Sequence, residues 1–100
     1  MMTYDIKKID DESYLLSVSG RLDTMTAPQL EEKAVELLKK ATKLTVDLEN
    51  LEYISSAGLR VILLMQKTIA QKGTMKLIHV PQAVMEIFEI TGFCDFLTIE

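Results

Sequence analysis

The sequence predicts a single α/β domain with a mixed, mostly parallel β-sheet, helices packed mainly on one face, and the element order ββαβαβαβ. Two periodicities carry this prediction, because alternating apolar residues indicate strands and apolar residues spaced by three and four indicate helices. After an opening pair of strands, the two kinds of segment alternate along the chain. The 100 residues are 48% hydrophobic and contain no linker, repeat or low-complexity tract, so we expect one domain over residues 1–100.

An opening β-hairpin is expected at the N-terminal end. Residues 4–9 are typical of a short strand, and an acidic turn over 10–12 follows. Tyr14, Leu16 and Val18 then alternate with polar or small residues, which indicates a second strand.

The first helix is predicted from the chemistry of its start. Thr26 is suited to the N-cap, Gln29 lies three residues later as in a capping box, and Pro28 is acceptable in a first turn. The helix is expected to run to about Lys40. Its apolar residues recur at spacings of three and four and are expected in the core: Leu30, Ala34, Leu37 and Leu38.

A strand over 43–48 has one apolar and one polar face, which predicts a sheet covered chiefly on one side. A second helix is expected from Ser55–Ser56 to about Lys72–Gly73, with glycine as its C-cap. The next strand covers 75–80, which implies a parallel pair joined by a right-handed crossover. A third helix over 81–92 and a short strand over 96–99 complete the chain.

Charge and composition exclude several functional classes. The net charge is −4 and the lysines and arginines are scattered, so neither nucleic acid nor an acidic membrane surface is an expected partner. Cys94 is the only cysteine, which excludes an intrachain disulfide and a C-x-x-C site. The N-terminus lacks a signal-peptide pattern, and the longest apolar run, 61–65, is too short to span a membrane. We therefore expect a cytoplasmic protein.

The stretch Ser55-Ser56-Ala57-Gly58-Leu59-Arg60 is the most informative part of the sequence. It lies at the expected start of the second helix, where unpaired N–H groups and the helix dipole stabilise an anion. A serine there can cap the helix, or it can be phosphorylated. Gly58 costs up to about 1 kcal/mol in a first turn, which suggests close approach of a kinase or a partner. No G-x-S-x-G elbow supports a hydrolase nucleophile.

Asp23 follows the second strand, and Ser56 follows a later one, so both are expected at the same end of the sheet. Asp23 is either a carboxylate near Ser56 or a residue that only bonds the backbone of its turn. Met25, in the same loop, is a candidate contact for a partner. His79 is the only histidine and is expected to have ordinary partners, so no metal site is predicted. Phosphate-loop and dinucleotide motifs are absent.

Three stretches together carry a resemblance to a known family. Residues 20–28 resemble the pattern G-x-L-D-x-x-[TS]-A, residues 47–54 resemble D-L-x-x-[LV]-x-[YF]-[IM], and residues 55–63 resemble the loop [DS]-S-[ASTG]-G-L-[GR]. On these motifs the chain is similar to STAS domains of the bacterial anti-sigma factor antagonist family. The resemblance spans essentially the whole chain.

The resemblance implies a partner-switching regulator without catalytic activity, cofactor or metal of its own. In the family, the unphosphorylated antagonist binds an anti-sigma factor, commonly a serine protein kinase, and releases the sigma factor. The kinase phosphorylates the loop serine and a serine phosphatase reverses this. Ser56 matches the phosphoacceptor, with Ser55 as the alternative because it stands where many members have aspartate. Asp23 matches a carboxylate near the phosphoacceptor.

The surface expected to bind the partner comprises Asp23, Thr24, Met25, Ser55, Ser56, Ala57, Gly58, Leu59 and Arg60. The free protein is expected to be a monomer. A second reading makes the chain a constitutive STAS docking subunit of another signalling or lipid-transport complex, with no phosphorylation. A third, nucleotide binding or NTPase activity near Asp23 and Ser56, is disfavoured because no phosphate cradle is present.

Overall fold

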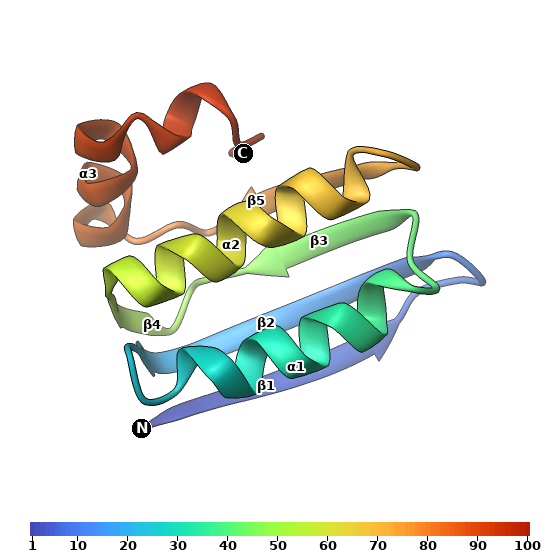
Figure 1. Ribbon diagram of the computed structural model, residues 1–100, viewed down its shortest axis with the longest axis horizontal. Coiled ribbons are helices and arrows are strands. Elements are labelled where there is room, and N and C mark those ends of the chain that lie inside the picture. Colours follow the sequence, from blue (N-terminus) through green and yellow to red (C-terminus); the bar gives the residue numbers. More distant parts are fainter.

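A computed structural model describes all residues 1–100 and confirms the predicted fold class. Two layers are visible in Figure 1, a twisted β-sheet and the helices that pack against it. The elements in chain order are β1 (Met2–Lys8), β2 (Ser13–Leu22), α1 (Ala27–Leu38), β3 (Lys43–Asp47), β4 (Leu51–Ile54), α2 (Ser56–Ile69), β5 (Thr74–Ile78), α3 (Gln82–Thr91) and a 3-10 turn over Phe93–Asp95.

The sheet is mixed, as predicted. β1 and β2 form the expected antiparallel hairpin, and β2, β3 and β5 follow side by side in parallel. On one face of these strands, alternate residues such as Leu16, Val46 and Leu77 are buried and in register with one another. The other face stays partly exposed, since its residues are half-buried, as Ser17 and Asp47 are, or exposed, as Lys43 is. The sheet is therefore covered chiefly on one side.

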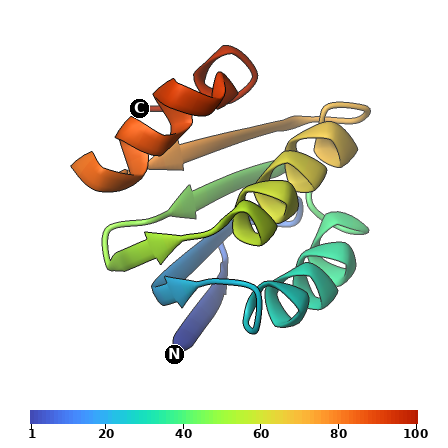
Figure 2. The same cartoon turned by 60° about the vertical axis from the view of Figure 1, so that its left-hand side comes forward.

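Helices α1 and α2 lie together on the buried face, and α3 lies at the β5 edge (Figure 2). Each helix buries an apolar stripe, because its apolar residues recur at the helical period. In α1 this stripe contains all four residues predicted for the core. None of the three helices is both long and apolar enough to cross a bilayer.

Strand β2 is long enough to pair with two strands on the same side. Its first half, Ser13–Ser17, pairs with β3, and its last part, from Gly20 to Leu22, pairs with β4. The register shifts between Gly20 and Arg21, and Gly20 has the left-handed φ of +85° that favours glycine. A side chain at position 20 would also strike the carbonyl of Met1, so the bulge and the N-terminus depend on glycine.

The structure differs from the sequence prediction in three elements. Strand β4 was not predicted, and the expected strand over 96–99 is reduced to one bridge between Leu77 and Ile99. Helix α2 ends at Ile69, earlier than predicted, and Ala70 rather than Gly73 is its C-cap. Gly73 instead packs so closely on the backbone of Thr42 that a Cβ atom would lie 1.8 Å from the Thr42 carbonyl oxygen.

Gly58 has a packing role that corrects the sequence interpretation. It is buried in the first turn of α2, and contacts within the fold already account for the glycine. A Cβ atom there would lie 2.8 Å from Leu22 Cγ and 2.9 Å from both Ile54 Cγ1 and the Leu22 carbonyl oxygen. The absence of a side chain therefore lets α2 start directly against β2 and β4.

Replacement of Gly58 by alanine is expected to destabilise the fold by about 1–3 kcal/mol, despite the better helix propensity of alanine, because the new methyl group overpacks this contact. Urea unfolding followed by circular dichroism measures the change. Ser56→Ala, at an exposed position of the same turn, is the matched control and should stay within about 0.5 kcal/mol of the wild type. An unfolding free energy for Gly58→Ala equal to that of the control would contradict the packing role.

Candidate functional site

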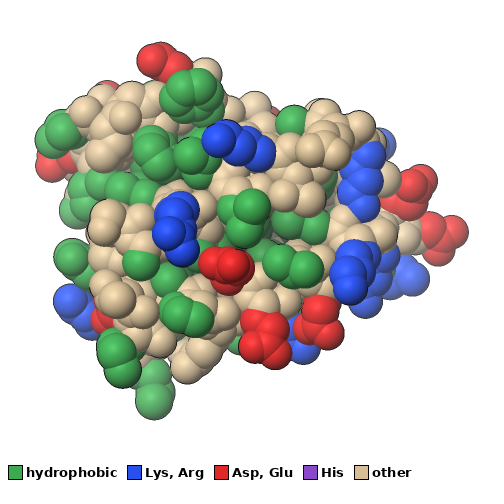
Figure 3. All heavy atoms as spheres, in the orientation of Figure 1, with side chains coloured by type: hydrophobic (Ala, Val, Ile, Leu, Met, Phe, Trp, Pro, Cys, Tyr) green, Lys and Arg blue, Asp and Glu red, His purple; other side chains and the backbone are tan.

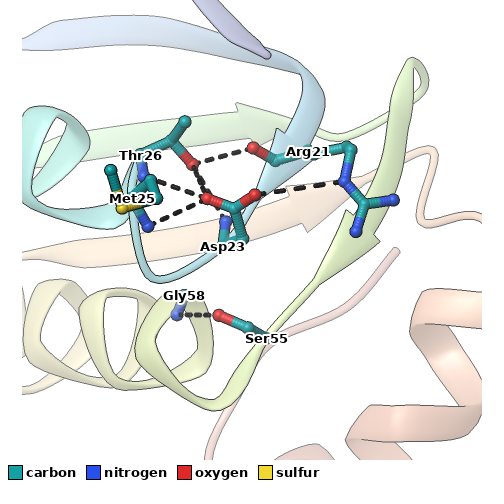
Figure 4. Close-up of polar contacts among 6 residues, drawn as sticks. All are labelled: Arg21, Asp23, Met25, Thr26, Ser55 and Gly58. Atoms are coloured by element: carbon teal, nitrogen blue, oxygen red, sulfur yellow. Dashed lines mark hydrogen bonds and ion pairs between the residues drawn. The ribbon is translucent and has the colours of Figure 1, made fainter.

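Two segments far apart in the sequence meet at the end of the sheet where β2 and β4 stop. The N–H of Ser55 donates a hydrogen bond of 2.9 Å to the carbonyl of Leu22, so the start of α2 lies beside the turn that follows β2 (Figure 4). Asp23 is the first residue of that turn. The structure thus brings Asp23 and the serine pair together, as the positions at strand ends predicted.

The turn after β2 is held by a closed set of hydrogen bonds. Asp23 Oδ1 accepts the N–H groups of Met25 at 3.0 Å and Thr26 at 3.1 Å. The Thr26 hydroxyl accepts the Asp23 N–H at 2.9 Å. Its own hydrogen is shared between the Arg21 carbonyl oxygen at 2.8 Å and Asp23 Oδ1 at 3.2 Å. Thr26 therefore binds its own turn and does not cap α1 with its side chain, so the predicted capping box with Gln29 is wrong.

These contacts lower the pKa of the Asp23 carboxyl below its ordinary value of 3.8. The largest cause is the backbone N–H of Thr26; the Met25 N–H, the Thr26 hydroxyl and the positive charge of Arg21 act in the same direction, and partial desolvation opposes them. Arg21 Nε lies 3.9 Å from Asp23 Oδ2. Asp23 is therefore ionised at neutral pH, and the hydrogen bonds of its turn hold the carboxylate in one position.

The two serines at the start of α2 have different roles. Ser55 is the N-cap, with an extended backbone, and its Oγ accepts the Gly58 N–H at 3.4 Å. Ser56 is the first residue of the helix, and its side chain is exposed. Because Ser55 supplies the cap, the hydroxyl of Ser56 is not needed to cap α2.

Two exposed side chains, one apolar and one aromatic, lie on the segments that meet beside the serine pair. Met25 is 81% exposed and Tyr53, in β4, is 39% exposed. The guanidinium of Arg21 lies over the Tyr53 ring, 4.3 Å from its centroid, because the two residues are paired across β2 and β4. Figure 3 shows more hydrophobic side chains at the end where α2 begins, whereas charged ones gather at the opposite end.

Not every residue of the predicted partner surface is accessible. Gly58 and Leu59 are buried and support the surface from beneath. Thr24, Met25, Ser56 and Arg60 are exposed, and the remaining residues are half-buried: Asp23, Ser55 and Ala57. Tyr53 is a further surface residue of the site that the sequence pattern does not reveal, because β4 is too short to be recognised.

A further cluster of polar residues lies at the ends of β3 and β5. His79 Nδ1 is 3.1 Å from Asp47 Oδ1, and Glu49 places a carboxylate oxygen within 4.8 Å of both. These residues have donor atoms suited to a divalent cation, although the sequence predicted no metal ligands around His79. The sequence separation of Asp47 and His79 hid their contact, which depends on the parallel pairing of β3 with β5.

The pKa of Asp23 gives a measurable expectation. Because the folded pKa is lowered, the ionised carboxylate stabilises the fold above about pH 4, and this stabilisation is lost as the pH falls through the folded pKa. The unfolding free energies of wild type and Asp23→Asn should therefore differ most above pH 4 and converge in acid. NMR titration of the Asp23 carboxyl should give a pKa below 3.8.

Thr26→Val should raise the pKa of Asp23 only part of the way towards its ordinary value, since the backbone N–H groups remain. An unchanged pKa in Thr26→Val would contradict the contribution of the hydroxyl.

Comparison with known proteins places the chain in a family. A family profile described as "Mlab, STAS domain" matches residues 7–98. BtrV of Bordetella bronchiseptica, which is named as an anti-sigma factor antagonist, is 37% identical over 100 residues, covering 98% of this chain and 85% of the relative. The anti-sigma-B factor antagonist of Bacillus subtilis is 30% identical over 96 residues, covering 95% of this chain and 87% of the relative.

Solved structures share the fold. The anti-sigma factor antagonist SpoIIAA in its unphosphorylated form superimposes with a TM-score of 0.84 at 18% identity, covering 98% of this chain and 88% of that one. An anti-sigma factor antagonist from Mycobacterium paratuberculosis gives a TM-score of 0.90 at 22% identity, covering 99% and 85%. The profile match, the curated relatives and the shared architecture agree with the motifs at residues 20–28 and 47–63. The chain belongs to the STAS domain family and is related within it to the anti-sigma factor antagonists.

Proposed function

We propose that this protein is an anti-sigma factor antagonist whose binding is switched off by phosphorylation of Ser56. One observation carries the assignment of the residue: Ser56 presents an exposed hydroxyl at the start of α2, while Ser55 caps the helix. The relation to BtrV and to the anti-sigma-B factor antagonist supports the class of partner. In its unphosphorylated form the protein binds an anti-sigma factor, itself a serine protein kinase, and a sigma factor is released.

The modification is a phosphoryl transfer carried out by the partner. The Ser56 oxygen attacks the γ-phosphorus of ATP, an O–P bond forms, the bond between the β,γ-bridging oxygen and the γ-phosphorus breaks, and ADP leaves. The hydroxyl proton passes to a base of the kinase. A serine phosphatase reverses the step with water, which returns the hydroxyl and releases inorganic phosphate. ATP and magnesium belong to the kinase, and this chain supplies the acceptor oxygen.

The switch follows from electrostatics without a large rearrangement. Phosphorylation adds about −1.5 to −2 charges at pH 7. In the free protein the N-terminus of α2 tolerates this charge, so the domain stays folded. In the complex the dianion is desolvated against the partner, and a buried charge that is not fully neutralised costs several kcal/mol. A loss of about 3 kcal/mol already weakens binding more than a hundredfold.

The constitutive docking reading makes the opposite prediction for the same residue. If the chain is a docking subunit of another signalling or lipid-transport complex, the exposed surface around Ser56 binds its partner permanently. Neither serine then carries phosphate in any growth condition. Mapping of the modification therefore separates the two functions.

Intact mass spectrometry of the protein from its native cells, with fragment mapping over 51–67, is expected to find one phosphoryl group on Ser56. The Ser56→Ala variant should carry none, because the acceptor oxygen is removed. Ser55→Ala is the matched control: it should still be phosphorylated, although loss of the cap lowers stability by about 1 kcal/mol. Phosphate on Ser55 in the wild type would keep the switch and correct the residue, and its absence from both serines would favour constitutive docking.

Binding to the anti-sigma partner is expected to depend on the exposed apolar side chain of Met25. Met25→Ala should weaken the complex at least severalfold in a titration calorimetry measurement, with the unfolding free energy unchanged, since the side chain is 81% exposed. Ile9→Ala is the control, because Ile9 is also an exposed apolar residue but lies just after β1, in the turn at the other end of the sheet. Equal affinities for Met25→Ala and Ile9→Ala would exclude Met25 from the interface.

A further inference from the structure

Arg60 lies one turn along α2 from Ser56 and shares its exposed face. Residues four apart on a helix are neighbours whose Cβ atoms are about 5–6 Å apart. Both side chains are exposed, whereas Gly58 and Leu59 between them are buried, so Ser56 and Arg60 project from the same side of the helix. None of the ion pairs in the structure involves Arg60.

The other cation near the serine pair is already engaged. Arg21 is 3.9 Å from the carboxylate of Asp23 and lies over the ring of Tyr53. Asp23 remains ionised because its Oδ1 accepts hydrogen bonds from its own turn, so it repels a phosphate on Ser56. Lys67, the next cation along α2, lies two further turns from Arg60. Of these cations, Arg60 is therefore best placed to form an ion pair with a phosphate on Ser56.

We infer that Arg60 is the internal counter-ion of phosphorylated Ser56: the phosphate and the guanidinium of these two residues form an ion pair along α2. The inference rests on the proposed phosphorylation and extends it to the regulation of the same site. Guanidinium groups bind phosphate oxygens through two parallel hydrogen bonds, which makes arginine better suited to this pair than lysine. The positive end of α2 acts on the phosphate in the same direction.

The ion pair gives the switch a second consequence. In the unphosphorylated protein, Arg60 is free to bind a carboxylate of the partner. After phosphorylation the same guanidinium is held by the phosphate. The partner then meets a new dianion and loses a cation, so one modification changes two contacts at once.

The test is a phosphorus NMR titration of the full chain with phosphoserine incorporated at position 56 during translation. The second pKa of the phosphate should be lower in the wild type than in Arg60→Gln by about half a unit, because the arginine stabilises the dianion. Arg60→Lys should retain only part of the difference. Lys67→Gln, which removes a positive charge from the same helix, is the matched control and should leave the pKa at the wild-type value.

Equal pKa values in wild type and Arg60→Gln would overturn the ion pair, as would a shift in Lys67→Gln as large as that in Arg60→Gln. The measurement needs neither kinase nor partner, so its result is separate from the test of the proposed function. An absent ion pair leaves phosphorylation of Ser56 in cells untouched. Conversely, a protein that is never phosphorylated in its native cells would refute the proposed function without altering this titration.

Discussion

The pairing of β4 with the last part of β2 is the constraint on which the site depends. This pairing ends in the hydrogen bond from the Ser55 N–H to the Leu22 carbonyl, which joins the two halves of the site. It requires glycine twice, at Gly20 for the bulge and at Gly58 for the close approach of α2. Both requirements act on the backbone, so the site is assembled by the sheet itself and not by a flexible loop. The proposed partner would therefore meet a preformed surface, and little ordering entropy would oppose binding.

The same pairing explains what sequence analysis could and could not predict about the fold. The hairpin, α1 and the β3–α2–β5 unit carry clear periods, so their type and order could be inferred. Leu51–Ile54 could not be recognised, because only its two end residues are buried and four residues are too few to show alternation. The last strand was over-predicted, since only Ile99 pairs as a bridge. The short strand β4 and the bridge at Ile99 depend on tertiary contacts, which a local sequence pattern does not reveal.

The site divides in a similar way. Asp23 and the serine pair could be placed together because the ends of neighbouring strands lie at one edge of a sheet. The division of roles between Ser55 and Ser56 could not be inferred, because either serine satisfies the chemistry of an N-cap. Thr26 is also a residue whose type suits an N-cap, and its hydroxyl was expected to cap α1. In the structure the hydroxyl instead bonds the Asp23 N–H and the Arg21 carbonyl. Local side-chain bonds of this kind compete with caps, and only the fold decides between them.

If Ser56 is phosphorylated as proposed, the fixed charges of the neighbouring residues make this small modification sufficient for a switch. Arg21, Arg60 and Asp23 sum to a local charge of 2 − 1 = +1 before phosphorylation, within a chain whose net charge is −4. A phosphate of about −2 reverses the local sign to about −1. Asp23 cannot soften this reversal by taking up a proton, because hydrogen bonds from its turn hold its pKa low. Position 55 carries an uncharged serine, so the unmodified site has no second carboxylate there and the sign reversal becomes possible. The proposed phosphorylation would therefore change a weakly cationic surface into an anionic one while the backbone beneath it stays in place.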